Sequence, residues 1–178
     1  MVDKVIIKMK KVAVFGNTGG GKSTLSRKLS EITNLPLYIL GKIQYKSGGI
    51  AVPYEDFKQN HEEIISKDEW GIDGFGSLEM VWLTLGKADT WVYIDLPLSV
   101  HFWWVTKRFI TGFFVPPKGW TENSPLLKSS LQSYNTLWLC HKRLTPRYRD
   151  YVLEAEKTKK VYHLKSTKDI KHFFDLIA

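Results

Sequence analysis

The sequence has one cysteine, Cys140, among 178 residues, which excludes an internal disulfide and any zinc site built from several cysteines. It also lacks a run of about 18 apolar residues, so no segment has the length of a membrane-spanning helix. The apolar patch at Val5–Ile7 is shorter than the apolar region of a signal peptide. Together these absences predict a cytoplasmic protein with no membrane as a partner.

Acidic residues are scarce in the second part of the chain. Residues 1–100 contain 12 lysines and arginines and 12 acidic residues, whereas residues 101–178 contain 14 and 6, which accounts for the net charge of +8. A basic C-terminal half can face polyphosphate, nucleic acid or an acidic membrane surface, or it can be a solvated face without a partner. No repeat or low-complexity segment is present. The length predicts a single domain over residues 1–178, with residues 1–9 as an N-terminal extension.

A glycine-rich motif lies near the N-terminus. Residues 16–23 read Gly-Asn-Thr-Gly-Gly-Gly-Lys-Ser, which matches the phosphate-binding pattern G-x-x-x-x-G-K-[ST]. The apolar run Lys11–Phe15 before it predicts a buried strand. The segment Ser23–Thr33 after it has apolar residues at helical spacing. Strand, glycine loop and helix form the context in which this motif binds nucleotides.

The chemistry of the motif predicts how the residues would act. Glycines let the chain curl so that main-chain N–H groups point at phosphate oxygens, and the helix N-terminus adds a positive dipole end. Lys22 supplies a mobile charge for the terminal phosphates, and the Ser23 hydroxyl is a magnesium ligand. We therefore expect ATP and Mg²⁺ as cofactors. The predicted nucleotide-binding residues of the loop are Gly16, Asn17, Thr18, Gly19, Gly20, Gly21, Lys22, Ser23 and Thr24.

Strand and helix patterns alternate along the chain, which predicts an α/β fold with a parallel sheet and helices on both faces. The expected strands are residues 11–15, 37–40, 70–73, 91–95 and 161–164. The expected helices begin near residues 22, 53, 78, 97, 125 and 167. Pro146 should kink or end the long helix that begins near 125. Residues 113–124 contain two prolines and a glycine, and they predict a short lid loop.

Several segments resemble one family of kinases. They are Lys11–Gly16 through Lys22–Leu25, Leu37–Leu40, Trp70–Gly74, Ala88–Thr90, Asp95–Pro97 and the basic pair Lys107–Arg108. From about Lys10 to the C-terminus the chain resembles the adenylate-kinase-related P-loop kinases, and most closely the DNA topology modulation proteins. The resemblance implies a P-loop NTPase fold with a five-stranded parallel sheet of order 2-3-1-4-5. It also implies ATP with magnesium as the donor and phosphoryl transfer to a small acceptor.

The chain departs from this family at the expected acceptor side. After the second strand, family members carry an acidic residue that is expected to touch the acceptor, and this chain has Gly41 there. Relatives often carry several arginines in and around the lid. Here the lid holds only Lys118, and Phe113 stands where many relatives have a phosphate-binding arginine. The resemblance therefore supports ATP binding more strongly than it supports any particular acceptor.

Two aspartates are candidates for the magnesium site. Asp73 ends the third expected strand, next to the phosphate loop if the implied strand order holds, and its carboxylate would hold magnesium through a water. The alternative is a turn aspartate in Asp73–Gly74. Asp95 is a rival candidate for metal binding or catalysis, but its position two residues before Pro97 is equally that of a helix cap.

Basic residues beyond the loop complete the predicted site. Arg108 precedes the lid, and in the related kinases an arginine at this place stacks on the adenine ring; alternatively it is a solvated cation at a helix end. Arg143 and Arg147 lie one helical turn apart and would reach back over the phosphates. The predicted catalytic residues are Lys22, Asp73, Arg108 and Arg143, and Ser23 and Asp73 are the predicted metal ligands. The five histidines show no metal-ligand spacing, and we assign them no role.

Three hypotheses for the function remain open from the sequence. The first is an ATP-dependent phosphotransferase of nucleoside- or nucleotide-kinase type, whose acceptor lies between residues 41–50 and 74–78 on the carboxyl side of the sheet. The second is a nucleotide-binding regulator that contacts nucleic acid through the basic half with little catalysis. The third is a kinase that acts on the end of a nucleic acid. The residues do not identify the acceptor.

Overall fold

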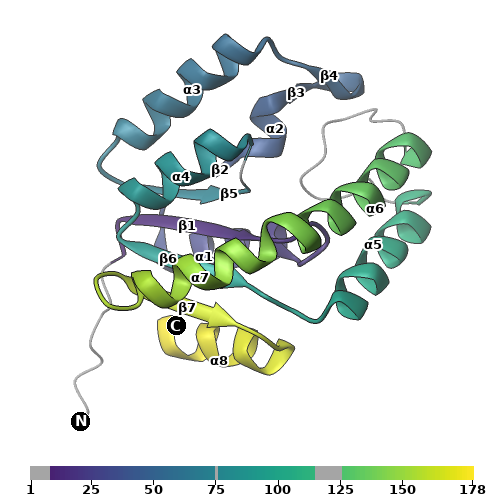
Figure 1. Ribbon diagram of the computed structural model, residues 1–178. Helices are drawn as coiled ribbons and strands as arrows, with labels where there is room; N and C mark the ends of the chain where they lie inside the picture. Colours follow the sequence, from purple (N-terminus) through teal and green to yellow (C-terminus); the bar gives the residue numbers. More distant parts are fainter. Residues whose placement is uncertain (1–8, 75, 115–125) are drawn as a thin grey trace.

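The computed structural model describes residues 9–74, 76–114 and 126–178, and a five-stranded parallel sheet forms its centre (Figure 1). The strands are β1 (Lys11–Gly16), β2 (Leu37–Ile39), β5 (Trp70–Asp73), β6 (Thr90–Ile94) and β7 (Lys160–Leu164). Their order across the sheet is β2-β5-β1-β6-β7, and every neighbouring pair is parallel. Numbered by position along the chain, this is the predicted order 2-3-1-4-5. The predicted fold class is confirmed.

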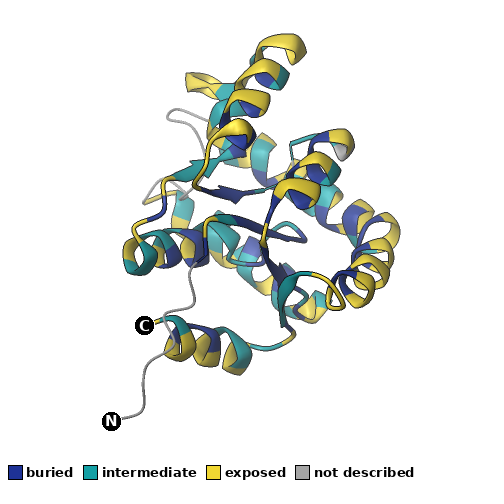
Figure 2. Ribbon diagram, turned by 90° about the vertical axis from the view of Figure 1, so that its left-hand side faces the viewer, coloured by how far each residue is buried: buried dark blue, intermediate teal, exposed yellow. Residues whose placement is uncertain are grey.

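Helices cover both faces of the sheet because its strands are apolar on both sides. In β1, Val12 and Val14 pack in the cluster that contains α1 (Lys22–Thr33) and α8 (Thr167–Ile177). The alternate residues Ala13 and Phe15 pack in the opposite cluster, which contains α3 (Tyr54–Ser66), α4 (Leu78–Lys87) and α7 (Thr145–Ala155). Figure 2 shows the buried strands between helices whose outer sides are exposed. Burial on both faces is typical of parallel sheets.

Two further helices, α5 (Leu98–Gly112) and α6 (Leu126–Arg143), lie side by side at the carboxyl ends of the strands (Figure 1). The predicted lid at residues 113–124 lies outside the described residues, apart from Phe113 and Phe114, which form a turn after α5. The long helix ends near Pro146, as the sequence predicts. α6 ends at Arg143, and α7 begins at Thr145 with Pro146 in its first turn, where a missing N–H costs nothing.

The second strand is one residue shorter than predicted, and residues 40–51 form elements that the sequence analysis did not predict. β2 ends at Ile39, and α2 (Leu40–Gln44) follows it directly. Then β3 (Tyr45–Lys46) and β4 (Ile50–Ala51) pair antiparallel around the 3-10 turn η1 (Ser47–Gly49). Gly48 and Gly49 adopt φ values of 79° and 74°, a conformation that favours glycine and allows this tight hairpin.

The first described residue corrects the predicted N-terminal extension. Met9 is buried among the apolar residues between the sheet and α1, so residue 9 belongs to the core. At the other end of the chain, α8 begins with a capping box formed by Ser166 and Asp169. Ser166 Oγ accepts from the Asp169 N–H, and Asp169 Oδ2 accepts from the Ser166 N–H. None of the helices in the described part is both long and apolar enough to cross a membrane.

Candidate functional site

The phosphate-binding motif forms the turn between β1 and α1, at the carboxyl edge of the sheet between β5 and β6. Gly16, the last residue of β1, has a φ of 138°, and a Cβ there would lie 2.3 Å from the carbonyl oxygen of Ile94 on β6. No other residue fits this backbone and this contact. Gly21, with a φ of 76°, caps the N-terminus of α1.

Helix α5 lies directly against the loop, and the loop glycines permit the approach. A Cβ on Gly19 would lie 2.4 Å from Val105 Cγ2, and a Cβ on Gly21 would lie 2.8 Å from the Trp104 ring. Gly19 also has a φ of 72°, which disfavours any side chain. A Cβ on Gly20 would lie 2.8 Å from His101 Cε1, so all three glycines leave room for α5 as well as for the sharp turn of the loop.

Two side chains that the sequence analysis did not assign to a packing role hold the loop in place. His101 on α5 is 2% exposed, and its Nδ1 lies 2.9 Å from the carbonyl oxygen of Thr18, so Nδ1 carries the proton and donates. Burial lowers the pKa of His101, which favours this neutral form. Asn17 is also buried; its Nδ2 donates to the Leu137 carbonyl of α6 at 3.0 Å, and its Oδ1 accepts from the Thr18 N–H.

The N-terminus of α1 offers an anion-binding surface. The N–H groups of Gly19, Gly20 and Gly21 donate to no acceptor within the described part of the chain. α1 has twelve residues and no acidic residue in its first turn, so no side chain there offsets the positive end of its dipole. Free amides and an uncompensated helix dipole are the features that bind phosphate.

Lys22 is the first residue of α1, and its Nζ donates to the Asn17 carbonyl at 2.8 Å. The side chain is half-buried in the site. Burial lowers the pKa of Lys22, the charge of Asp73 opposes this change, and Arg108 adds repulsion. The charges of Asp73 and Arg108 are therefore near enough to act on Lys22.

Asp73 ends β5, the strand that pairs with β1, and it is 2% exposed. Burial raises its pKa, while the charge of Lys22 and the proximity of the Ser23 hydroxyl act in the opposite direction. Its Oδ1 is buried and has no hydrogen-bond partner among the described residues. A buried carboxylate oxygen without a partner costs free energy unless another group engages it. The placement beside Ser23 agrees with the sequence prediction.

This donor set fits magnesium. Mg²⁺ usually takes one or two carboxylates or hydroxyls from the protein and completes its shell with phosphate oxygens and waters. Asp73 Oδ1 and the Ser23 hydroxyl supply such a pair. The described residues contain no group of three or more His, Cys, Asp or Glu side chains that would enclose a metal by themselves. A metal held jointly by the protein and a nucleotide therefore matches the residues present.

The two arginines that were predicted to be catalytic differ in burial: Arg108 is partly buried and Arg143 is exposed. Arg108 is on α5, seven residues after His101, and its Nη2 donates to Ser133 Oγ on α6 at 2.9 Å. Arg108 is partly buried, and this burial lowers the pKa of its guanidinium. Arg143 is the last residue of α6 and is exposed, and it makes no hydrogen bond or ion pair with the described residues. Its role over the phosphates stays a prediction.

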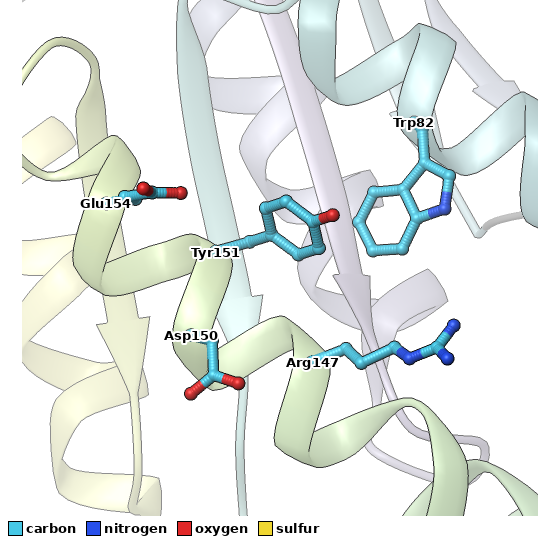
Figure 3. A pocket seen from close by; sticks show the side chains of 5 residues that line it. All are labelled: Trp82, Arg147, Asp150, Tyr151 and Glu154. Carbon is cyan, nitrogen blue, oxygen red and sulfur yellow. The ribbon is translucent and has the colours of Figure 1, made fainter.

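Arg147 does not join the predicted pair of phosphate-facing arginines. It lines an open hollow of about 370 Å³ between α4 and α7, which Figure 3 shows from close by. The rings of Trp82 and Tyr151 meet there with centroids 4.6 Å apart, and Asp150 and Glu154 complete the lining. This hollow lies between two helices that cover one face of the sheet.

Asp95 has a structural role that the sequence analysis did not weigh. Its carboxylate accepts two hydrogen bonds from Arg149, at 2.8 and 2.9 Å, and a third contact from His163 Nε2 at 3.0 Å. Burial opposes ionisation of Asp95, but the hydrogen bonds from Arg149 and His163 lower its pKa overall. The cap of α5 is Pro97, without a side-chain hydrogen bond. The expectation that Asp95 caps this helix is therefore wrong, and Asp95 instead ties α7 to the sheet.

The sheet order and the loop together define a P-loop kinase fold, and solved structures agree. The structure is similar to that of shikimate kinase from Acinetobacter baumannii in complex with shikimate, with a TM-score of 0.58 and 18% sequence identity. The similarity covers 98% of this chain and 96% of that chain. Over 96% of this chain and 95% of the other, the structure is also similar to a sugar kinase from Janibacter sp. HTCC2649, with a TM-score of 0.50 and 15% identity. At these identities the likeness shows the fold alone.

In sequence, the chain is 34% identical over 87 residues to a shikimate kinase of Leptospira borgpetersenii serovar Hardjo-bovis (strain JB197). The match spans 48% of this chain and 44% of the relative. No protein-family model matches the chain. The comparisons thus support the broader part of the sequence resemblance, a P-loop kinase fold.

Proposed function

We propose that this protein is an ATP-dependent phosphotransferase that acts on a small-molecule acceptor. The observation that carries the proposal is that the free amides at the N-terminus of α1 adjoin Lys22, the first residue of this helix, while Asp73 ends the neighbouring strand β5 and its charge acts on Lys22. The names of its relatives, shikimate kinase and sugar kinase, support a small acceptor with a hydroxyl group to phosphorylate. The fold alone would not carry the proposal, because one fold hosts many activities.

Each group at the site has a role in phosphoryl transfer, which depends on positioning and on neutralising charge. The amides of residues 19–21 and the α1 N-terminus bind the phosphates. Lys22 neutralises charge on the transferred group, and Arg108 adds a second cation or stacks on the base. Asp73 and Ser23 would hold magnesium, which supplies charge compensation at the phosphate oxygens.

The acceptor region is proposed to lie between residues 41–50 and 74–78. The structure brings α2 and the β3–β4 hairpin to the carboxyl side of the sheet, above the end of β5 (Figure 1). Gly41 supplies no carboxylate to an acceptor there, which distinguishes this chain from the pattern of the DNA topology modulation proteins. Membership of that group and a nucleoside- or nucleotide-type acceptor stay predictions.

The alternative function is a nucleotide-binding regulator that contacts nucleic acid and has little catalytic activity. The absence of a side chain at Gly41 and the exposed, unpaired position of Arg143 favour it, since both weaken the acceptor and phosphate contacts expected of a kinase. A kinase for nucleic-acid ends combines the features of both. The three hypotheses differ in what receives the phosphate.

A screen with γ-labelled ATP tests the proposal. Purified protein is incubated with Mg²⁺ and with nucleosides, nucleotides, sugars, hydroxylated ring acids and oligonucleotides. We expect label to enter one class of small acceptor, and Lys22→Ala to abolish the transfer. Label in an oligonucleotide would instead identify an end kinase. ATP binding without transfer to any acceptor, together with DNA binding that falls steeply with salt, would establish the regulatory alternative.

A further inference from the structure

The paired helices α5 and α6, together with the turn Phe113–Phe114 that follows α5, carry eight of the fourteen large apolar side chains that are exposed in the described part of the chain. Trp103 is 62% exposed, Phe114 is 85% exposed and Leu131 is 62% exposed. The exposed large apolar residues of this pair are Trp103, Ile110, Phe113, Phe114, Leu127, Leu131, Trp138 and Leu139. A contiguous surface of this kind on a soluble fold marks an interaction site.

The exposed residues form one stripe on each helix. On α5 the stripe is Trp103, Lys107 and Ile110, which follow one another at spacings of four and three residues, so they share one side of the helix. The loop-facing residue Val105 and its neighbours occupy another side of α5. The stripe therefore faces away from the phosphate loop.

The stripe on α6 is Leu127, Leu131, Trp138 and Lys142, which also share one side of their helix. Residues between the stripes and the core join the two helices. They are Phe102 and Thr106 on α5 and Tyr134 on α6, with the Phe102 and Tyr134 rings stacked and a 2.6 Å hydrogen bond between Thr106 and Tyr134. Because both stripes lie beyond this junction, they form one continuous outer face, which we call the α5–α6 outer face.

The charge of the α5–α6 outer face has a single sign. The described residues of α5 and α6 include no aspartate or glutamate, and Lys107, Lys128, Lys142 and Arg143 are exposed on them. Lys142 Nζ lies 4.8 Å from the centroid of the Trp138 ring, so its apolar stem and the indole cover one another. Aromatic rings, aliphatic side chains and lysines in one plane are the pattern of segments that lie at a membrane interface.

We propose that the α5–α6 outer face binds the surface of a membrane that contains anionic lipids. Charge complementarity selects this occupant over two others. A second copy of the chain, docked by a two-fold axis, would bring lysines against lysines with no acidic residue between them. Nucleic acid would use the aromatic rings and lysines but would leave the aliphatic residues Ile110, Leu127 and Leu131 against a charged backbone.

In this arrangement Trp103, Ile110, Leu131 and Trp138 enter the boundary between headgroups and acyl chains, and the lysines remain at the headgroups. The proposal revises the expectation that no membrane is a partner, because lying on a bilayer requires no spanning helix. It does not depend on phosphotransferase activity, since it concerns the side of α5 opposite to the loop.

The test is cosedimentation of the whole chain with vesicles, without nucleotide. Vesicles of phosphatidylcholine alone are compared with vesicles that also contain phosphatidylglycerol. We expect binding to the anionic vesicles that weakens, but does not vanish, as salt is raised. Trp103→Ser/Leu131→Ser should reduce binding at least about tenfold, whereas Leu153→Ser/Leu176→Ser, which alters exposed leucines elsewhere, should bind like the natural chain.

Charge reversal separates electrostatics from apolar insertion. Lys107→Glu/Lys142→Glu should reduce binding to anionic vesicles at least about tenfold, since each lysine near such a surface is attracted to the anionic headgroups and each glutamate is repelled. Lys168→Glu/Lys171→Glu on α8 makes the same change in net charge away from the face and is the matched control. Circular dichroism confirms that each variant is folded. The chain staying in the supernatant with both vesicle types, or equal binding by all four variants, would overturn the proposal. So would dimerisation or oligonucleotide binding that the outer-face variants alone abolish.

Discussion

Lys22 and Asp73 are both in surroundings where burial disfavours the charged form. Each charge in turn favours the charged form of the other. Burial lowers the pKa of Lys22 and raises that of Asp73, and each charge partly offsets the burial of the other. Asp73 Oδ1, which is buried without a hydrogen-bond partner among the described residues, adds a further cost in free energy. These groups cost free energy of folding when no ligand is bound, and they are already positioned to contact phosphate and metal.

Replacing Lys22 with alanine should therefore remove transfer rather than stability. We expect a loss of about a hundred- to a thousand-fold in the rate of transfer, as for other preorganised charged or polar donors, together with weaker ATP binding. Steady-state kinetics and ATP titration measure both. Lys171→Ala, which removes an exposed lysine of α8, is the matched control and should change neither. Full activity of Lys22→Ala would exclude the proposed site.

Asp73→Asn should separate stability from activity. Because the pKa of Asp73 is raised in the folded protein, its ionisation favours unfolding as pH rises above the value of an unfolded aspartate, about 3.9. The asparagine cannot ionise, so near pH 7 the variant should unfold at a higher temperature and lose magnesium-dependent transfer. Thermal unfolding at pH 7 and activity against magnesium concentration provide the measurements. A lower unfolding temperature with normal metal dependence would show that Asp73 is only a turn residue.

At the scale of elements, the packing of α5 on the loop explains why residues 19–21 are all glycine. Gly19→Ala places a Cβ 2.4 Å from Val105 Cγ2 at a φ of 72° and should cost about 1–3 kcal/mol of stability. The cost should be smaller in a Val105→Ala background, which removes the clash. Gly48→Ala has a φ of 79° with nothing within 4 Å, so it reports the backbone contribution alone. Equal costs of Gly19→Ala in both backgrounds, measured by denaturant unfolding, would contradict this packing.

The contact between Asp95 and Arg149 links α7 to the carboxyl end of β6, and it predicts a pH dependence. The pKa of Asp95 is lowered in the folded protein, so its stabilisation is complete above the unfolded value, about 3.9, and is lost as pH falls below it. Asp95→Asn should cost about 0.5–1 kcal/mol at neutral pH, a modest value because Arg149 is 53% exposed. The difference from the natural chain should close below about pH 4, and Asp175→Asn, which replaces an exposed aspartate of α8, is the matched control. A difference that persists undiminished at low pH would exclude the ion pair as its source.

The sequence allowed prediction of those elements whose signals are local. Residues 11–33 carry strand, loop and helix patterns in a row, and Pro146, Ser166 and Asp169 mark helix ends with their own chemistry. The contacts that fix the site are long-range. His101 bonds to a carbonyl 83 residues away, and Asn17 to one 120 residues away. No spacing in the chain signals such pairs, so their roles emerged only once α5 and α6 were placed against the loop.

The hairpin at residues 45–51 was missed for a different reason. Two-residue strands are too short for an alternating pattern, and the glycines between them are equally typical of an open loop. Asp95 shows the converse problem. Its place before Pro97 predicts a helix cap. In the structure, however, its carboxylate accepts two charge-assisted hydrogen bonds from Arg149, 54 residues later in the chain, and does not cap the helix.

At the scale of the whole molecule, the sheet order places β1 between β5 and β6, so the loop, Asp73 and the start of α5 meet at one edge. The helices α5 and α6 have two sides with different surroundings. Their inner residues contact the loop, and the α5–α6 outer face is open to solvent. A ligand that binds only the folded loop should stabilise the entire fold, by about 2.7 kcal/mol at a hundredfold excess over its dissociation constant.

The most direct test of the central claim is calorimetric titration of the chain with ATP in the presence of Mg²⁺. The account predicts saturable binding of one nucleotide per chain, with little or no binding in Lys22→Ala and unchanged binding in Lys171→Ala. If no nucleoside triphosphate binds to the natural chain under these conditions, the loop is not a nucleotide site and the proposed function is wrong.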